Sequence, residues 1–390
     1  MRMAPLAVMG VLSLWACADG RSPNADVVID TIGQTLHVRN TSDGVWEEGE
    51  SWRLREVWRL GGLDAPETEQ FTDARQVLSL GPNGSLFALD QGASLVRVFS
   101  GDGEFIRSFG RPGRGPADLS AAFAMAWGPD DHLWIAEGFS GQYTVFDSAG
   151  AFVDTGIRPF RVILGGEGRL EVTDDGHVLE FQRYEEGLGV IEVDPEAGEV
   201  VGAMASLETP PLPRGLPSFF RPEGDEAARE FSRAFTSRLR WTWQPDGTVW
   251  STETGSPILR QTGPGGDTRR IVEIPHRMRE FTASERDMID RAQRQYSIPD
   301  EDVSLPTVTR LIHLGDGHLL AQVAGEMNQV TTLIDVFDPE GRYLGTIDAP
   351  FAMDPRGIPA IRGDTIVAVA LEDLDVPVLI RALIERPSAF

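Results

Sequence analysis

The stretch LSLGPNGSLFALD, Leu78 to Asp90, places two short apolar runs on either side of a polar turn that contains Pro, Asn and Gly. A second stretch, VRVFSGDGEFIRSF from Val96 to Phe109, alternates apolar and polar residues around another glycine-bearing turn. A two-residue period interrupted by Gly, Asn and Asp is typical of antiparallel hairpins. Residues 78–109 therefore predict one antiparallel unit of four short strands, called A to D from the inside outward.

The first hairpin of this unit returns five more times along the chain. Each copy has an apolar run, a polar turn and a second strand, and the residues just after the turns are Ser85, His132, His177, Thr248, His318 and Thr365. These positions are 47, 45, 71, 70 and 47 residues apart. A four-stranded repeat of roughly 45 residues is the size of a propeller blade. The sequence thus predicts an all-β, six-bladed β-propeller with insertions in its two long intervals.

The two ends of the repeat array complement each other. The sixth unit stops after VPVLIRALIER, Val376 to Arg386, without an obvious fourth strand. A stretch with the character of a fourth strand, WRLREVWRLGG from Trp52 to Gly62, precedes the first unit. Pairing of these two strands would close the ring and leave no open sheet edge at the junction. We expect a single closed propeller domain over residues 26–390.

Both insertions join strand D of one unit to strand A of the next, so they lie on the face that carries the B–C loops, here called the open face. The first, residues 206–239, begins proline-rich and then spaces Ala227, Ala228, Phe231, Ala234 and Phe235 as a helix does, with Asp225 available as N-cap. In the second, Thr282 and Glu285 form a capping-box pattern. Two short helices on one face either cover part of the central funnel or shield apolar strand ends.

The stretch HLGDGHLL, His313 to Leu320, resembles a metal site at first sight. In the repeat, however, His313 falls on the end of strand A and His318 on the start of strand B. Other copies carry Ser or Thr where His318 stands, whereas a metal site needs convergent ligands with supporting partners. We interpret the stretch as a hairpin, on the face of the A–B and C–D turns, here called the turn face.

Charge excludes several classes of function. The formal net charge is −25, and all 35 basic residues are arginine, so lysine-based chemistry is absent. An acidic excess of this size repels nucleic acid and anionic lipid. We therefore expect no nucleic-acid partner and no membrane binding through a basic face.

The N-terminus indicates export. Arg2 and the apolar run Met3 to Ala16 suit a signal peptide, residues 1–16, and are too short for a comfortable membrane span. The only cysteine of the chain, Cys17, follows directly, and LWAC, Leu14 to Cys17, resembles the lipobox of bacterial lipoproteins, although Trp15 departs from it. The resemblance implies a lipid on Cys17, a tether over residues 17–25, and, through Ala18, location at the outer membrane or in the periplasm. The alternatives are an ordinary signal peptide or an isolated cysteine.

A family resemblance follows from RSFGRPGRGPADL, Arg107 to Leu119, which comes after a strand pair ending in VFSGDGEF. It is similar to NHL-type repeats and to the six-bladed, TolB-like propellers of bacterial envelopes. The first two units carry the resemblance in their residues, and the other four only in their shape. Because propellers host enzymes and binding modules alike, the resemblance implies an architecture rather than an activity.

Carboxylates at the end of strand B are the first candidates for function. Asp90, Glu137 and Glu253 share this register. Clustered carboxylates serve as acids or ligands, but repeated ones also anchor loops by accepting backbone N–H bonds. The calcium-dependent lactonases that this architecture resembles use Asn ligands, of which only Asn328 falls on the open face inside the ring. The related zinc lyases need several histidines, and only His276 lies near that face.

Arginines are frequent in the open-face connections, and Phe219 and Phe220 stand beside one of them. Arg with aromatic residues suits recognition of carboxylates, peptides or sugars. The predicted ligand-binding residues are Asp90, Arg111, Arg114, Glu137, Arg158, Gln182, Arg221 and Glu253. We expect a monomeric, non-catalytic binding or scaffold module for a peptide, protein or small polar ligand, without metal or cofactor. The alternative is a periplasmic metal-dependent hydrolase or lactonase with its site in the central funnel.

Overall fold

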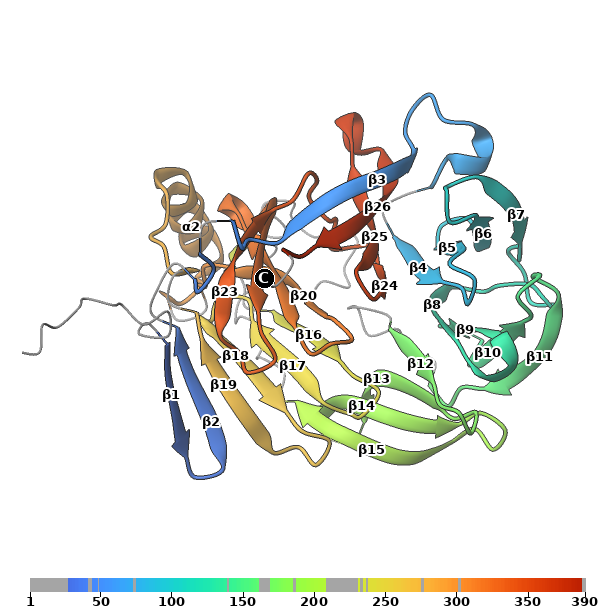
Figure 1. Ribbon diagram of the computed structural model, residues 1–390, viewed down its shortest axis with the longest axis horizontal. Coiled ribbons are helices and arrows are strands. Elements are labelled where there is room, and N and C mark those ends of the chain that lie inside the picture. Colours follow the sequence, from blue (N-terminus) through green and yellow to red (C-terminus); the bar gives the residue numbers. More distant parts are fainter. Residues whose placement is uncertain are drawn as a thin grey trace, which may run out of the picture.

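Six antiparallel sheets form a ring around a central axis (Figure 1). The computed structural model describes residues 27–40, 44–47, 49–72, 75–138, 140–160, 169–184, 187–207, 231, 234–235, 238–274, 277–300 and 303–387. The six-bladed β-propeller predicted from the repeat is confirmed. Strand A of each unit lies innermost, and in blades 1 to 5 strands B to D follow in sequence order toward the outside.

The blades follow one another in chain order. Blade 1 contains β4 (Gln76–Leu80), β5 (Leu86–Asp90), β6 (Leu95–Phe99) and β7 (Phe105–Phe109), and blade 2 contains β8 (Ala122–Trp127), β9 (Leu133–Glu137), β10 (Gln142–Phe146) and β11 (Phe152–Ile157). Blade 3 contains β12 (Leu170–Val172), β13 (Val178–Tyr184), β14 (Gly187–Asp194) and β15 (Glu199–Leu207), and blade 4 contains β16 (Leu239–Trp243), β17 (Val249–Glu253), β18 (Ile258–Thr262) and β19 (Thr268–Glu273). Blade 5 contains β20 (Val308–His313), β21 (Leu319–Ala324), β22 (Val330–Phe337) and β23 (Tyr343–Asp348), and blade 6 contains β24 (Ala360–Arg362), β25 (Thr365–Leu371), β26 (Pro377–Glu385) and β3 (Arg53–Gly61).

The predicted closure of the ring is confirmed by β3, which pairs antiparallel with β26 as the outermost strand of blade 6. Figure 1 shows the two strands side by side, one near each end of the colour scale. Leu60 lies opposite Leu379, and Leu54 lies opposite Ile384. Early and late parts of the sequence therefore complete one sheet together.

The predicted register of the A–B turns is confirmed. In blades 1 to 5, the N–H group of the residue after strand A donates to the carbonyl of the residue that follows the turn. The donors and acceptors are Gly81 and Ser85, Gly128 and His132, Thr173 and His177, Gln244 and Thr248, and Leu314 and His318. The stretch from His313 to Leu320 is thus a hairpin whose strand A ends at His313, as expected.

The N-terminal segment adds strands that the repeat did not predict. β1 (Val27–Ile32) and β2 (Thr35–Asn40) form a hairpin, and β2 pairs parallel with β19 at the outer edge of blade 4. Farther along, the N–H groups of Val45 and Trp46 donate to carbonyls of Tyr343 and Leu344 in blade 5. The segment before blade 1 therefore runs along the outside of blades 4 and 5 before β3 completes blade 6.

Hydrophobic clusters fill the space between neighbouring blades. Between blades 5 and 6, Ile312 and Ile334 pack with Ile366 and Ile380. Between blades 3 and 4, the ring of Phe181 stacks on Trp241 with 3.8 Å between centroids. Each blade thus buries both faces, which explains the nearly continuous apolar runs of the inner strands.

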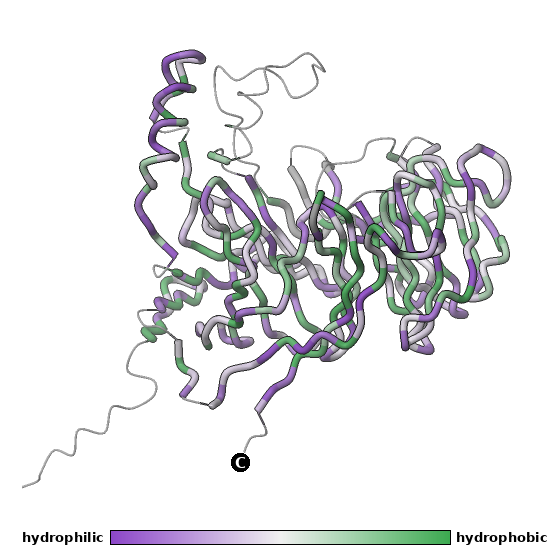
Figure 2. Tube along the Cα trace, turned by 90° about the horizontal axis from the view of Figure 1, so that it is seen from above, coloured by the Kyte–Doolittle hydropathy of each residue, from purple (hydrophilic) through white to green (hydrophobic). Residues whose placement is uncertain are grey.

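The insertions form a small separate core on the open face. Helix α2 (Ala283–Tyr296) begins with the predicted capping box, because Thr282 accepts from the Glu285 N–H and Glu285 accepts from the Thr282 N–H. Ile289 and Ala292 of α2 pack with Phe231, Ala234 and Phe235 of the first insertion. Ala227 and Ala228 lie outside the described residues. Figure 2 shows α2 standing out from the body of the ring.

The described 3-10 helices are single turns. The described 3-10 helices span Glu67–Glu69, Pro129–Asp131, Glu326–Asn328 and Asp373–Asp375. Within the described part of the chain, no helix combines the length and the apolar character needed to cross a membrane.

Candidate functional site

A pocket of about 250 Å³ lies on the propeller axis, where the inner strands of all six blades meet. Its walls come from β4, β8, β12, β16, β20 and β24 and from residues just before β12 and β24. Trp127 and His313 are the last residues of their strands, so the pocket extends toward the turn face. Hereafter this space is called the channel pocket.

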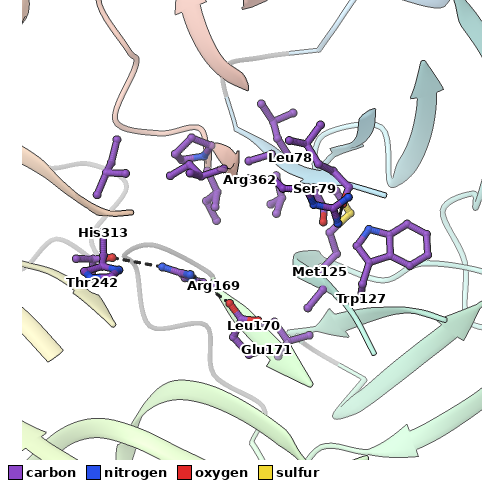
Figure 3. Close-up of a pocket in the computed structure, with 18 of the residues that line it drawn as sticks. Leu78, Ser79, Met125, Trp127, Arg169, Leu170, Glu171, Thr242, His313 and Arg362 are labelled. Carbon is purple, nitrogen blue, oxygen red and sulfur yellow. Dashed lines mark hydrogen bonds and ion pairs between the residues drawn. The ribbon is translucent and has the colours of Figure 1, made fainter. Parts of the chain in front are cut away.

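Arg169 lies in the middle of the channel pocket in the view of Figure 3. Its guanidinium donates to Glu171 across 3.2 Å and to the Thr242 hydroxyl across 3.4 Å. Its Cζ atom also lies 5.7 Å from the centre of the Trp243 ring. Its side chain is 34% exposed. Arg169 is therefore held loosely by several weak contacts and presents a positive charge to the pocket.

Two further arginines line the pocket and are held by backbone carbonyls. Arg362 donates to the carbonyls of Leu80 at 2.8 Å and Gly81 at 2.5 Å, which ties blade 6 to blade 1. The buried Arg310 donates to the carbonyl of Gly357 at 2.6 Å. The carbonyl partners of Arg362 fix the direction of its guanidinium without neutralising its charge.

His313 forms part of the wall next to Arg169. Burial, reinforced by the positive charge of Arg169, lowers the pKa of His313 from its ordinary 6.5 to about 4. The side-chain amide of Gln244 contacts the imidazole ring. His313 is therefore a neutral hydrogen-bonding group at pH 7 and a weak base.

The remaining walls are apolar. Met125 and Trp127 come from β8, and Leu78 comes from β4 (Figure 3). The indole of Trp127 meets the ring of Phe87 edge to face, with 4.8 Å between centroids. This contact fixes the orientation of the indole. The channel pocket thus combines a rigid apolar wall with a few polar side chains, as ligand sites commonly do.

Asp90, a predicted ligand contact, is fully buried at the end of β5. It accepts hydrogen bonds from the Thr72 N–H at 3.0 Å and from Arg97 at 2.9 Å. Although burial raises its pKa, the hydrogen bonds from Thr72 and Arg97 hold the pKa of Asp90 below its ordinary value. These contacts are those of a loop anchor.

Glu137 occupies the same register in blade 2 and is 1% exposed. It accepts from the Ser120 N–H at 2.9 Å, from Ser140 at 3.2 Å and from Gln142 at 3.1 Å. The carboxylate therefore joins the D–A connection and the B–C loop of its blade. Its contacts match the anchoring role that the sequence left open.

Arg158 and Gln182 meet at a carboxylate that the sequence did not single out. Glu180, 2% exposed, accepts from Arg158 at 2.9 Å and from Gln182 at 3.2 Å. The Tyr143 hydroxyl also donates to Glu180 at 2.7 Å, and burial together with this charge raises the pKa of Tyr143. This network lies inside the contact between blades 2 and 3, where a solute cannot reach it.

The other predicted residues lie apart. Arg111 is exposed and pairs with Asp118, and Arg114 is exposed in the same connection. Glu253 is exposed and lines a second hollow, of about 500 Å³, on the side of blade 4 that faces blade 3. Arg221 and Cys17 lie outside the described residues, as do His276, Phe219 and Phe220. Among the residues that the structure describes, the predicted ligand-binding side chains therefore do not form one site.

One group of possible metal ligands occurs among the described residues. Single ligand atoms of Asp175, His177 and Glu192 lie within 4.8 Å of one another on the turn side of blade 3. Nδ1 of His177 is 2.7 Å from Glu192, and this hydrogen bond raises the pKa of His177. The arrangement favours a protonated imidazole in an ion pair.

Sequence reasoning missed the residues of the channel pocket. The next-to-last position of strand A faces the channel in blades 1 to 5, where it holds Ser79, Ala126, Glu171, Thr242 and Ile312. Polar residues at this position of an otherwise apolar strand were a signal for the site. The residues just after the turns, on which the repeat is aligned, do not include this position, so they give no sign of Glu171 and Thr242.

Comparisons with known proteins bear on the fold. No protein-family model matches this chain, and no curated protein matches it. A member of the DUF4221 family from Bacteroides vulgatus is similar, with a TM-score of 0.50 and 10% identity over 87% of this chain and 99% of that chain. A protein from Bacteroides fragilis described as exported gives a TM-score of 0.49 and 11% identity over 85% and 96% of the two chains. A gluconolactonase from Xanthomonas campestris gives 0.42 and 14% over 86% and 90%. Identities this low speak to architecture alone.

Proposed function

We propose that this chain is an exported β-propeller that binds a small polar ligand in its channel pocket without transforming it. The observation that carries the proposal is the convergence of six inner strands on one pocket of about 250 Å³. Arg169, Glu171, Thr242 and His313 supply a few polar groups among apolar walls. A cavity of this size suits a ligand of metabolite size.

The chemistry of the walls supports binding rather than catalysis. Glu171 is the one carboxylate among the described lining residues, and Arg169 holds it. A hard cation such as Ca²⁺ takes about six to eight oxygen ligands. His313, with a pKa of about 4, is poorly matched to proton transfer at neutral pH. If the alternative of a metal-dependent hydrolase or lactonase were correct, Ca²⁺ would raise the melting temperature and EDTA would lower it.

The predicted ligand contacts fall into two groups under this proposal. Asp90, Glu137, Arg158 and Gln182 are buried, and we assign them to anchoring of loops and blades. Arg111, Arg114 and Glu253 are exposed and keep a proposed role in contacting a peptide or protein partner. We also retain, as part of the proposal, the affiliation with NHL-type or TolB-like propellers.

Export and anchoring rest on the N-terminal sequence. The apolar run before Cys17 and the LWAC motif support cleavage before Cys17 and lipidation of its thiol, with the propeller held in the periplasm or at the outer membrane. Cys17→Ser should move the protein from the membrane fraction to the soluble fraction. An unchanged distribution would refute the anchor and leave the ligand site unaffected.

The ligand site is tested by blocking the channel. Ser79 faces the pocket from β4, and Ser79→Phe would fill part of it without changing charge. Ser108→Phe, at an exposed position on β7, is the matched control. A fragment library is screened by ligand-observed NMR against the mature protein and both variants. We expect fragments that bind the wild type and the control and fail to bind Ser79→Phe. Equal binding to all three proteins would refute the channel pocket as the site.

A further inference from the structure

We infer that the ligand of the channel pocket is a small organic anion, a carboxylate with an apolar body. This inference rests on the proposed function, because it assigns a chemical class to the same site. Two arginines that are not fully buried, Arg169 and Arg362, line the pocket with a single carboxylate, Glu171. His313 is neutral, so the described walls carry a positive excess within a protein whose net charge is −25.

Arg169 is the group placed to meet the anion. Its contacts with Glu171 and Thr242 are 3.2 and 3.4 Å long, at the weak end of the range for hydrogen bonds. A third of the side chain is exposed, so the guanidinium can exchange these contacts for a ligand carboxylate. A planar guanidinium binds a carboxylate through two parallel hydrogen bonds, an arrangement stronger than one neutral pair.

Arg362 supplies a second positive charge at a fixed place. The carbonyls of Leu80 and Gly81 hold it, and no carboxylate of the described chain lies within 4.0 Å of its guanidinium nitrogens. Arg362 is exposed, so a ligand carboxylate can approach its guanidinium and form charge-assisted hydrogen bonds with it. Because the carbonyls already orient this side chain, binding requires little ordering of Arg362.

The negative surface of the protein does not reverse this preference. Charges on the surface are screened over about 8 Å at physiological ionic strength. Groups that line a pocket act at contact distance with little intervening water, where their interaction is stronger. The lining arginines therefore dominate the energy of a bound anion, while the acidic surface acts mainly on the rate at which an anion approaches.

The apolar walls define the rest of the ligand. Trp127 and Met125 form one side of the pocket, and Leu78 and Ile312 come from other blades. Trp127 is fixed by its contact with Phe87, so it offers a flat, preformed surface. An aromatic or branched aliphatic body fits such a wall better than a fully hydroxylated one.

The experiment compares two probes of nearly the same shape, phenylacetate and phenylacetamide, which differ in charge. Dissociation constants are measured by calorimetry at one ionic strength for the mature wild type, Arg169→Gln, and the control Arg260→Gln, which alters an exposed arginine of the second hollow. We expect the wild type and the control to bind phenylacetate about tenfold more tightly than phenylacetamide, the factor for one charge-assisted hydrogen bond. The preference should disappear in Arg169→Gln.

His313 provides a second readout in the same samples. The charged groups that act on it are Arg169, Asp246, Asp316 and His318. A carboxylate beside Arg169 should raise the pKa of His313, measured by NMR of the ring protons, whereas the amide should leave it near 4. Arg169→Gln should raise the pKa without ligand and abolish the further change.

The outcomes separate this inference from the proposed function. Equal affinity of the wild type for the two probes would overturn the anionic class, and a carboxylate preference that survives undiminished in Arg169→Gln would overturn the assignment of the anion to Arg169. If neutral fragments bind in the pocket and phenylacetate does not, the anionic class is wrong and the site remains. If Ser79→Phe loses no fragment at all, the channel pocket itself is not the ligand site.

Discussion

Glu180 links blades 2 and 3 through a buried ion pair and hydrogen bonds. It accepts from Tyr143 and Arg158 of one blade and from Gln182 of its own, with no described member of the network exposed beyond a few per cent. In the repeat its position is apolar or small elsewhere, as at Ala88 and Ile135, so the pattern predicted a buried hydrophobic residue. This one departure from the repeat marks the residue that holds the buried contact between the two blades.

Removing this carboxylate should be costly. Glu180→Ala leaves Arg158 buried without its partner, and we expect a loss of about 3–5 kcal/mol in the free energy of unfolding. Urea denaturation measures it. The control is Glu192→Ala, which breaks a partly exposed pair with His177 and should cost less than about 1 kcal/mol. Replacing both partners, Arg158→Met with Glu180→Leu, should restore most of the loss. A loss under about 1 kcal/mol in Glu180→Ala would contradict the buried-pair assignment.

Glu285 gives a pH-dependent prediction for the insertion. Hydrogen bonds from Arg279, at 2.7 Å to each oxygen, outweigh the burial that raises its pKa and lower the pKa of Glu285 from 4.5 to about 2. A carboxylate with a lowered pKa stabilises the fold above its unfolded value and loses that contribution as the pH falls toward the folded value. The stabilisation of α2 should therefore be complete above about pH 4.5 and weaken between 4.5 and 2.

The measurement is hydrogen exchange of the α2 amides at pH 5 and pH 3, corrected for intrinsic rates. Wild type should lose protection at pH 3. Glu285→Gln should show weak protection at both values, and Glu280→Gln, whose side chain is 93% exposed, should behave as wild type. Unchanged protection of α2 at pH 3 would contradict the role of Glu285.

At the scale of elements, the A–B turn is the unit of repetition. In blades 1, 3, 4 and 5 a glycine with positive φ stands just before the residue that follows the turn, at Gly84, Gly176, Gly247 and Gly317. Side chains disfavour this backbone region, which explains why glycine recurs there. The turn pattern carried enough physical information to predict the hairpins and their register from the sequence.

Gly84 allows the backbone effect to be measured alone. Its φ is +80°, and a Cβ atom there would meet no atom within 4 Å. Gly84→Ala should therefore cost about 1 kcal/mol from conformation and nothing from collision. Gly101→Ala is the control, because its φ is not in the left-handed region and the nearest atom would be 3.5 Å away. Thermal denaturation compares the two, and equal melting temperatures would contradict the argument.

The N-terminal hairpin β1–β2 is an element whose place in the fold the repeat did not predict. Its own alternation is that of a strand pair, but its partner β19 lies more than 200 residues later and joins it in parallel. The buried Asn40 accepts from the Tyr343 N–H and donates to the carbonyls of Glu273 and Gly341, so it links blades 4 and 5. Such a contact between distant segments leaves no periodic signal, because it depends on tertiary packing alone.

At the scale of the whole molecule, closure of the ring joins the ends of the chain, and its strength is testable. Leu60 on β3 is 7% exposed and packs in the cluster between blades 6 and 1. Leu60→Ala should lower the free energy of unfolding by about 2–5 kcal/mol. Val57→Ala, on the same strand but at a position 44% exposed, should change it by less than about 0.5 kcal/mol. Similar losses in the two variants would contradict the importance of the closing strand.

The fold could be predicted because the same hairpin pattern occurs six times in the sequence. The site could not be predicted in this way. Asp90 and Glu137 stood out in the sequence because a carboxylate recurs at the end of strand B. In both blades this carboxylate accepts a backbone N–H bond from a loop and so anchors that loop. The channel pocket is built from positions whose residue type changes from blade to blade: Thr242 stands where other blades carry Ser79, Ala126, Glu171 and Ile312. Their proximity arises only when the ring closes.

The pairing of β3 with β26 also constrains the order in which the parts of the chain can fold. The strand that finishes blade 6 precedes blade 1 in the chain, and its partner β26 follows it by more than 300 residues. The strands of blades 1 to 5 are close together in sequence and can pair locally, but β3 has no partner until β26 is available. A chain that lacks β26 would leave β3 as an unmatched strand, open to proteases and to pairing with other unfolded chains.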